Sequence, residues 1–174
     1  PLQPQSCYTV TKILGEELCR LYWHTYRLSY TVLRLFNTYG LEQAPGYFIP
    51  DQLLKAQRGN FDLLGSDITK DWVHVTDVAD AFVKALTVDI PCTLNIGTGV
   101  ETNLETIARF IAKAYQVELN ALHSDSPTRM CADWGLARSI LGWEPTVCLE
   151  DGIRNILDVP MGAIAEMPQG KVAI

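Results

Sequence analysis

The stretch SCYTVTKILGEEL at residues 6–18 opens a predicted helix that sets two reactive side chains next to each other. Apolar residues recur there at the helical period, which predicts a helix over residues 7–29. Tyr8 and Lys12 stand four residues apart, so their side chains lie on one face of this helix. An ammonium group beside a phenol favours the phenolate, and such a tyrosine can exchange a proton with a substrate hydroxyl. The spacing also fits a purely structural pair, a half-buried tyrosine beside an exposed lysine.

Strand and helix patterns alternate along the rest of the chain, which predicts the α/β class. Strands are expected at residues 31–37, 61–65, 71–75, 93–97 and 117–123. Further helices are expected at residues 50–58, 76–86, 102–115, 134–141 and 149–157, with Thr76, Thr102 and Asp133 as capping residues. Residues 158–174 lack periodicity, so we expect an extended or loosely packed tail there.

Composition describes an ordinary globular domain. Of 174 residues, 48% are apolar and 20% charged, enough for one domain with a sizeable core. The net charge of −6 argues against nucleic acid or an anionic membrane as the main partner. Since no apolar run approaches the roughly 18 residues that span a bilayer, and no signal peptide is visible, we expect a cytoplasmic protein.

Cysteine and histidine positions suggest no special chemistry. The five cysteines are scattered and form no CxxC, which predicts reduced and mostly buried thiols. The three histidines lack the spacing of metal ligands, so we predict no metal site.

Five segments in one order give the chain its resemblance to a known family. Together they closely resemble the second half of the extended short-chain dehydrogenase/reductases, and more narrowly the NAD-dependent nucleotide-sugar epimerases and dehydratases. The resemblance covers about residues 1–157. The segments are PLQPQSCYTVTK (1–12), LRLFNTYG (33–40), GSDITKDWVHVTDVADAFVKAL (65–86), LNIGTG (94–99) and ADWGLARSILGWEP (132–145).

The resemblance implies roles for four residues near the reacting atoms. Tyr8 would exchange a proton with the sugar 4-hydroxyl while a hydride passes between that carbon and the nicotinamide. Lys12 would hold the nicotinamide ribose and favour the Tyr8 phenolate. Phe36 would lie near the nicotinamide and Asn37 would hydrogen-bond the substrate. Alternatively, Phe36 is strand core and Asn37 ends the strand in a turn.

The resemblance also implies two contacts to the nucleotide diphosphate. Lys70 stands where relatives carry an arginine, so it keeps the charge but loses the planar fork that grips phosphate. Arg129 stands where relatives carry an arginine that faces the diphosphate. The alternatives are a solvated Lys70 and a surface Arg129 paired with Asp125 or Asp133.

Three other residues of these segments read as structural. We expect Asp77 and Asp80 to serve the start of a helix through its macrodipole rather than chemistry. Trp143 in LGWEP is expected to pack in the core.

Half of the family pattern is missing from this sequence. The chain contains no GxGxxG or GxxGxxG, and the family's catalytic Ser/Thr upstream of Tyr8 is absent. On the family pattern roughly 130–150 residues are missing, about one domain's worth. The expected fold is therefore the C-terminal half of a Rossmann-like domain with its substrate-binding subdomain, over residues 1–157.

Three interpretations follow from the missing half. The chain is part of a nucleotide-sugar enzyme that oxidises sugar C4 with NAD or NADP, and alone it is inactive and binds NAD weakly or not at all. Alternatively it is a non-catalytic module for nucleotide-sugar binding or dimerisation, or a separate chain supplies the first half. The expected partners are a nucleotide-diphosphate sugar and a second copy of the chain. The reaction stays open among 4-epimerase, which we favour, dehydratase and decarboxylase.

Overall fold

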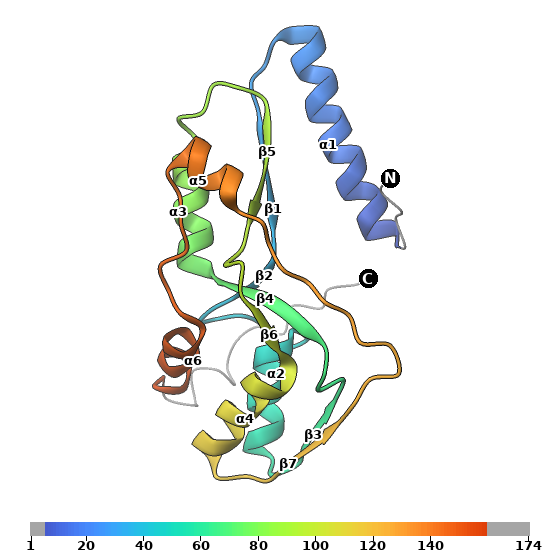
Figure 1. Cartoon of the computed structure of the whole chain (residues 1–174), viewed down its shortest axis with the longest axis vertical. Coiled ribbons are helices and arrows are strands. Elements are labelled where there is room, and N and C mark those ends of the chain that lie inside the picture. Colours follow the sequence, from blue (N-terminus) through green and yellow to red (C-terminus); the bar gives the residue numbers. More distant parts are fainter. Residues whose placement is uncertain (1–5, 160–174) are drawn as a thin grey trace.

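The computed structural model describes residues 6–159, which form six helices and seven strands (Figure 1). The alternation of helices with mostly parallel strand pairs confirms the α/β class. In chain order the elements are α1 (Cys7–Tyr26), β1 (Thr31–Leu35), β2 (Asn37–Tyr39), α2 (Phe48–Gln57), β3 (Phe61–Leu64), β4 (Thr69–His74), α3 (Val75–Ala85), β5 (Cys92–Ile96), β6 (Glu101–Asn103), α4 (Leu104–Tyr115), β7 (Leu119–Leu122), α5 (Gly135–Leu141) and α6 (Leu149–Leu157).

An upper lobe forms around a parallel pair of strands, β1 and β5, with Thr31 opposite Cys92 and Leu35 opposite Ile96 (Figure 1). Helices α3 and α5 lie along one side of this pair, and α1 stands on the other (Figure 1). The upper core lies on the α3 and α5 side, and Trp143, with none of its surface exposed, confirms the expected packing. Its buried members are Val73, Val78, Ala81, Leu94, Ile96, Ala137 and Trp143.

A lower lobe contains the remaining strands and the helices α2, α4 and α6 (Figure 1). Strand β4 lies between β2, its parallel neighbour, and β6, its antiparallel neighbour, while β3 pairs with β7. The apolar faces of the three helices bury the larger core of the molecule against these strands. Its buried members are Tyr39, Ile49, Leu53, Ala56, Phe61, Leu63, Trp72, Leu104, Ile107, Ala108, Ile111, Ala112, Ile153 and Ile156.

The predicted strand over residues 31–37 is in fact two strands in two sheets. The Phe36 N–H still donates to the Ile96 carbonyl at 2.9 Å, which completes the ladder of the upper lobe. The next residue, Asn37, then pairs with Trp72 of β4 in the lower lobe. An apolar run shows that the segment is buried but not that it changes partners, so the prediction missed the switch.

Several predicted helix ends were wrong by one to three residues. Helix α1 ends at Tyr26 and not at residue 29, because Arg27 takes the left-handed conformation (φ 56°) and its N–H closes on the Trp23 carbonyl. Helix α4 is capped by Asn103, whose side chain accepts from the Thr106 N–H, and not by Thr102. Similarly, α3 begins at Val75 with His74 as its cap. The predicted tail over residues 158–174 lies mostly outside the described residues, and its first residue, Asp158, is the C-cap of α6.

The cysteines are free, as predicted, but within the described residues none is buried. Three are exposed, and the other two, one on α1 and one at the start of β5, are partly covered. The prediction of mostly buried thiols was therefore wrong. The exposed cysteines are Cys7, Cys131 and Cys148, and the partly covered ones are Cys19 and Cys92.

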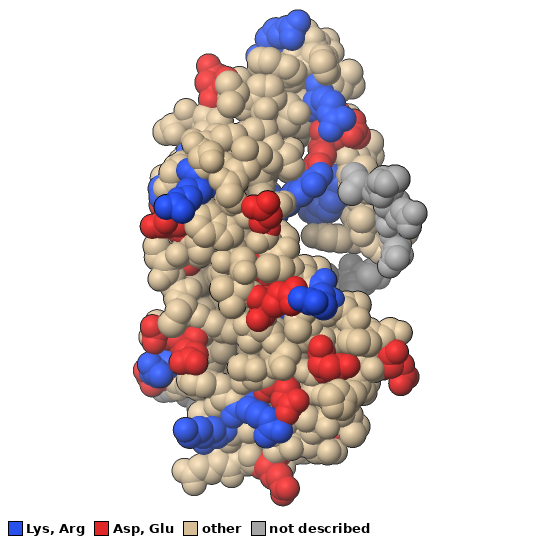
Figure 2. Space-filling model, viewed as in Figure 1, with Lys and Arg blue, Asp and Glu red and all other residues tan. Residues whose placement is uncertain are grey.

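The surface carries mixed charges. Acidic and basic side chains are interspersed over both lobes on the face shown in Figure 2. Among the described helices none is long and apolar enough to cross a bilayer.

Candidate active site

The first two turns of α1 present Tyr8 and Lys12. Ser6 caps the helix, and its hydroxyl oxygen accepts the Thr9 N–H at 3.2 Å, so the helix begins immediately before the pair. The two side chains meet on one helix face, with the Lys12 ammonium 5.1 Å from the centre of the Tyr8 ring. Tyr8 is 69% exposed, which leaves its hydroxyl open to a ligand.

A cavity of about 570 Å³ lies where Tyr8 faces the junction of β1 and β2. It brings together Tyr8, Phe36 and Asn37, three of the predicted site residues, from two segments of the chain. The lining is completed by Leu35, Thr38, Gln43, Tyr47, Phe48 and Trp72. Strand switching at Phe36 creates this arrangement, because the strand leaves the upper sheet at the point that faces the tyrosine.

A groove of about 530 Å³ continues from this cavity between α1 and β1. Tyr8 and Leu35 line both spaces, whereas Lys12 lines the groove. The groove is lined by Tyr8, Lys12, Gly15, Glu16, Cys19, Val32, Leu33, Arg34 and Leu35.

The Asn37 side chain has a fixed orientation. Its amide nitrogen donates to the main-chain carbonyl of Asp71 at 3.0 Å and lies 3.6 Å from the Met130 sulfur. The amide group is therefore held in place before any substrate arrives.

Lys70 and Arg129 are not among the residues that line the Tyr8 cavity. Lys70 is on β4 opposite Thr102, and the hydrogen bond from the Thr69 N–H to the Thr128 carbonyl (3.0 Å) sets the segments that carry Lys70 and Arg129 next to each other. The two basic residues thus come from adjacent segments, as a shared contact to one anion would require.

The partner of Arg129 is Glu101, and not Asp125 or Asp133 as the surface alternative supposed. Its Nε and Nη2 atoms donate to one Glu101 carboxylate oxygen at 3.0 and 2.7 Å. This hydrogen bond and the negative charge of Glu101 raise the pKa of the Arg129 guanidinium. Arg129 nevertheless remains 77% exposed.

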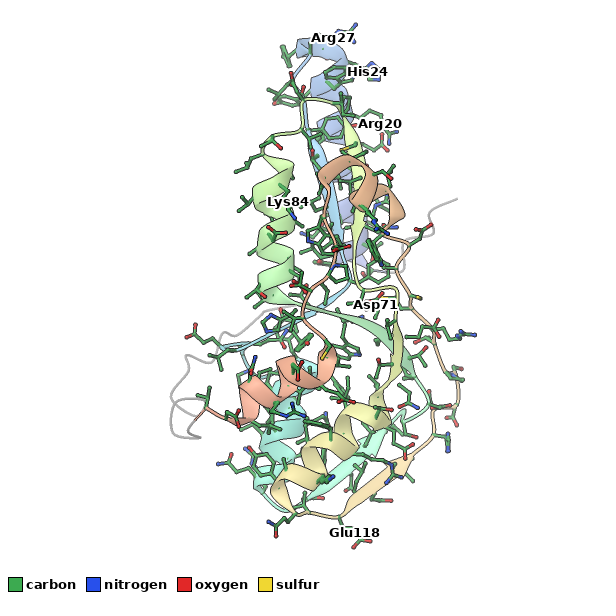
Figure 3. The ribbon with its side chains drawn as sticks, turned by 60° about the vertical axis from the view of Figure 1, so that its left-hand side comes forward. Arg20, His24, Arg27, Asp71, Lys84 and Glu118 are labelled. Carbon is green, nitrogen blue, oxygen red and sulfur yellow. The ribbon has the colours of Figure 1, made fainter. Side chains whose placement is uncertain are left out.

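Asp71 is the residue that sequence reasoning missed. It is fully buried at the junction of the two lobes (Figure 3), where its carboxylate accepts four hydrogen bonds. One oxygen accepts from the N–H and hydroxyl of Thr98, both at 2.7 Å, and the other accepts from the N–H groups of Gly99 (2.8 Å) and Ala132 (2.9 Å). An aspartate inside the apolar strand DWVHV was the available signal, because a buried carboxylate needs such partners.

Asp77 does more than the expected helix-start electrostatics. It lies in the first turn of α3, as predicted, but is 4% exposed. Its carboxylate accepts from the Thr146 hydroxyl at 2.7 Å and from the N–H groups of Thr146 and Val147. Asp77 therefore anchors the segment that leads into α6.

Within residues 6–159, no group of three or more His, Cys, Asp or Glu side chains could hold a metal ion.

The chain matches the GDP-mannose 4,6 dehydratase family over residues 1–156. It is 34% identical over 170 residues to a putative UDP-glucose 4-epimerase of Methanocaldococcus jannaschii, covering 91% of this chain and 54% of that protein. It is 27% identical over 165 residues to UDP-glucuronic acid decarboxylase 1 of Xenopus tropicalis, covering 90% of this chain and 39% of that protein. The chain thus spans about half the length of these relatives, or less.

Solved structures share the fold. The Bacillus cereus UDP-glucuronic acid 4-epimerase, in complex with UDP-glucuronic acid and NAD, superposes with a TM-score of 0.81 at 27% identity. That match covers 91% of this chain and 53% of the epimerase. The Thermotoga maritima UDP-glucose 4-epimerase with UDP-glucose gives a TM-score of 0.81 at 28% identity, covering 89% and 53%.

These matches confirm the resemblance of the five sequence segments and the expected fold, a part of a Rossmann-like domain. The chain belongs to the GDP-mannose 4,6 dehydratase family of extended short-chain dehydrogenases/reductases, whose members are NAD-dependent nucleotide-sugar epimerases, dehydratases and decarboxylases.

Proposed function

We propose that this chain is the part of a nucleotide-sugar-modifying enzyme that supplies proton transfer and substrate contacts. The observation that carries the proposal is the cavity where Tyr8, beside the Lys12 ammonium, meets Phe36 and Asn37. The reaction is oxidation at sugar C4 followed by epimerisation, dehydration or decarboxylation, with 4-epimerisation favoured. The similarity to a putative UDP-glucose 4-epimerase supports that preference.

Each residue has one task in this proposal. Tyr8 exchanges a proton with the sugar 4-hydroxyl, and Lys12 holds the nicotinamide ribose. Asn37, whose amide is already fixed by the Asp71 carbonyl, orients the substrate. Lys70 and Arg129 come from adjacent segments and bind the nucleotide diphosphate.

The residues present fit one end of NAD or NADP. Tyr8, Lys12 and Phe36 form an open surface for the nicotinamide and its ribose, where the cofactor would take and return the hydride. The pyrophosphate end has no cradle here, because the sequence lacks a Gly-rich phosphate loop. The chain alone therefore binds NAD weakly or not at all and is inactive by itself.

Nucleotide-sugar binding can be tested on the chain alone. UDP-glucose, dTDP-glucose and GDP-mannose are each expected to raise its melting temperature if they bind through Asn37, Lys70 and Arg129. Arg129→Ala should remove the shift, whereas Arg20→Ala, an exposed arginine of α1, should leave it intact. If none of the three nucleotide sugars gives a shift, the substrate contacts are refuted.

Catalysis can be tested in a chimera in which this chain replaces the matching part of the Thermotoga maritima UDP-glucose 4-epimerase. Tyr8→Phe should cut turnover at least about 100-fold and spare UDP-glucose binding, because only proton transfer is lost. Tyr26→Phe is a matched control, since Tyr26 is 70% exposed at the other end of the same helix. Unchanged turnover in Tyr8→Phe would remove Tyr8 from catalysis.

The second candidate function is a non-catalytic binding or dimerisation module. Exposed apolar side chains along α1 support self-association, among them Leu14 and Leu21, each 56% exposed. Light scattering that gives a homodimer, together with a folded chimera that binds UDP-glucose without turnover, would favour this alternative.

A further inference from the structure

We propose that the ion pair between Glu16 and Arg34 is a positioning clasp that holds the Tyr8 helix over strand β1. The Arg34 Nε atom donates to Glu16 Oε1 at 2.8 Å, and its Nη2 atom donates to Glu16 Oε2 at 2.6 Å. Both carboxylate oxygens are used, so the pair is bidentate and fixes direction as well as distance. It joins two elements that carry different parts of the candidate site.

Helix α1 packs loosely on the rest of the described chain. None of its 20 residues is buried. Among the described residues, every other side-chain hydrogen bond, ion pair or ring contact of this helix stays within the helix and its two capping residues. Within residues 6–159, the Glu16–Arg34 pair is thus the polar side-chain contact that ties α1 to another element.

The clasp connects the two faces that form the site. Tyr8, Lys12 and Glu16 follow one another at four-residue intervals, and all three line the groove between α1 and β1. On the other side of the groove, Arg34 stands two residues before Phe36, so their side chains lie on the same face of the strand. The carboxylate thus sets the distance between the tyrosine and the Phe36–Asn37 junction.

The chemistry of the pair suits a positioning role. Glu16 is 21% exposed and Arg34 is 45% exposed. The hydrogen bond from Arg34 lowers the pKa of Glu16, so the carboxylate stays ionised in the clasp. A lysine at position 34 would keep the charge but lose the fork that contacts both oxygens.

The proposal rests on the proposed function only for what Tyr8 does once it is positioned. Its test needs no ligand and no turnover. If the chain binds no nucleotide sugar, the positioning of α1 by Glu16 and Arg34 can still be measured. If the clasp proposal is refuted, the result of the nucleotide-sugar binding test is unaffected.

The experiment measures the distance between α1 and the rest of the chain by pulsed electron paramagnetic resonance. One spin label is placed on the native Cys7 at the start of α1, and the other on Val83→Cys in α3, an exposed site on the opposite side of the β1–β5 pair. The other four cysteines are replaced by serine. A single narrow distance distribution is expected in this background.

The variants distinguish the loss of the Glu16–Arg34 ion pair from a general destabilisation of the fold. E16Q and R34K should each broaden the distribution, and the reversed pair E16R/R34E should restore a narrow one. Melting temperature should change little in all of them, because α1 has no buried residue and a partly exposed ion pair contributes little to global stability. An unchanged distribution in E16Q would overturn the proposal, and so would a reversed pair that stays as broad as E16Q.

A matched control lies one residue away. Glu17 pairs with Arg20 at 3.2 Å inside α1 and contacts no other element through that pair. E17Q removes the same charge from the same helix and should leave the distance distribution narrow. Broadening in E17Q equal to that in E16Q would also refute the clasp, because it would trace the effect to helix charge alone.

Discussion

Replacing the buried Asp71 by asparagine should strongly destabilise the protein. Each carboxylate oxygen of Asp71 accepts two hydrogen bonds, from Thr98 on one side and from Gly99 and Ala132 on the other. Asparagine keeps one of these oxygens and replaces the other by an NH₂ group, which cannot accept. With the NH₂ group toward Gly99 and Ala132, two N–H donors lose their acceptor, whereas with it toward Thr98 the N–H loses its acceptor and the hydroxyl can turn and accept.

The expected loss follows from that count. A hydrogen bond to a charged group contributes about 1.5–3 kcal/mol, so the one or two lost bonds cost about 1.5–6 kcal/mol. A domain of ordinary stability has about 5–15 kcal/mol in total. With a urea dependence of about 2 kcal/mol per molar, the unfolding midpoint of Asp71→Asn should fall by about 0.7 M or more.

Urea unfolding followed by circular dichroism is the assay, with Asp89→Asn as the control. Asp89 accepts one hydrogen bond, from the exposed Ser29 hydroxyl at 2.7 Å, so its substitution should change the midpoint little. If Asp71→Asn lowers stability by less than about 1 kcal/mol, the four contacts do not act as the structure indicates.

Two glycine substitutions should change the stability of the protein in opposite directions, and a third substitution should change its affinity for UDP. Gly152→Ala would bring a Cβ atom to 2.8 Å from the Tyr39 ring, and overpacking should cost about 1–3 kcal/mol in unfolding experiments; an unchanged midpoint would contradict this. Gly15→Ala has nothing within 4 Å of the added Cβ inside α1, so it should raise stability by up to about 1 kcal/mol and serves as the matched glycine control. Glu101→Gln frees Arg129 and should tighten UDP binding roughly two- to fivefold in calorimetry, whereas weaker binding would show that Glu101 helps to orient the arginine.

Local patterns predicted the fold class and most elements well. Tyr8 and Lys12 were expected on one helix face, and Trp143 was expected in the core, because helical spacing and aromatic burial are local properties. The strand switch at Phe36 was not predictable in this way, since it depends on Ile96 and Trp72, far along the chain.

Contacts between distant residues account for the misses in the site as well. Arg129 pairs with Glu101, which is 28 residues away in the sequence, although Asp125 and Asp133 are much nearer to it in the sequence. The four bonds of Asp71 reach residues 27 to 61 positions away. Periodicity carries no information on such separations, whereas a buried charge inside an apolar strand at least signals that partners exist. The roles of the site residues stay predictions.

The strand that changes sheets at Phe36 also has a mechanical consequence. Phe36, the last residue of the upper ladder, and Asn37, the first residue of the lower one, are joined by a single peptide unit. The backbone therefore has no linker between the two sheets at this point. At this crossing, a tilt of one lobe against the other must be taken up by the few dihedral angles around residues 35–37. Such a tilt would change the distance between Asn37 and Tyr8, because this crossing lies beside the cavity that both residues line.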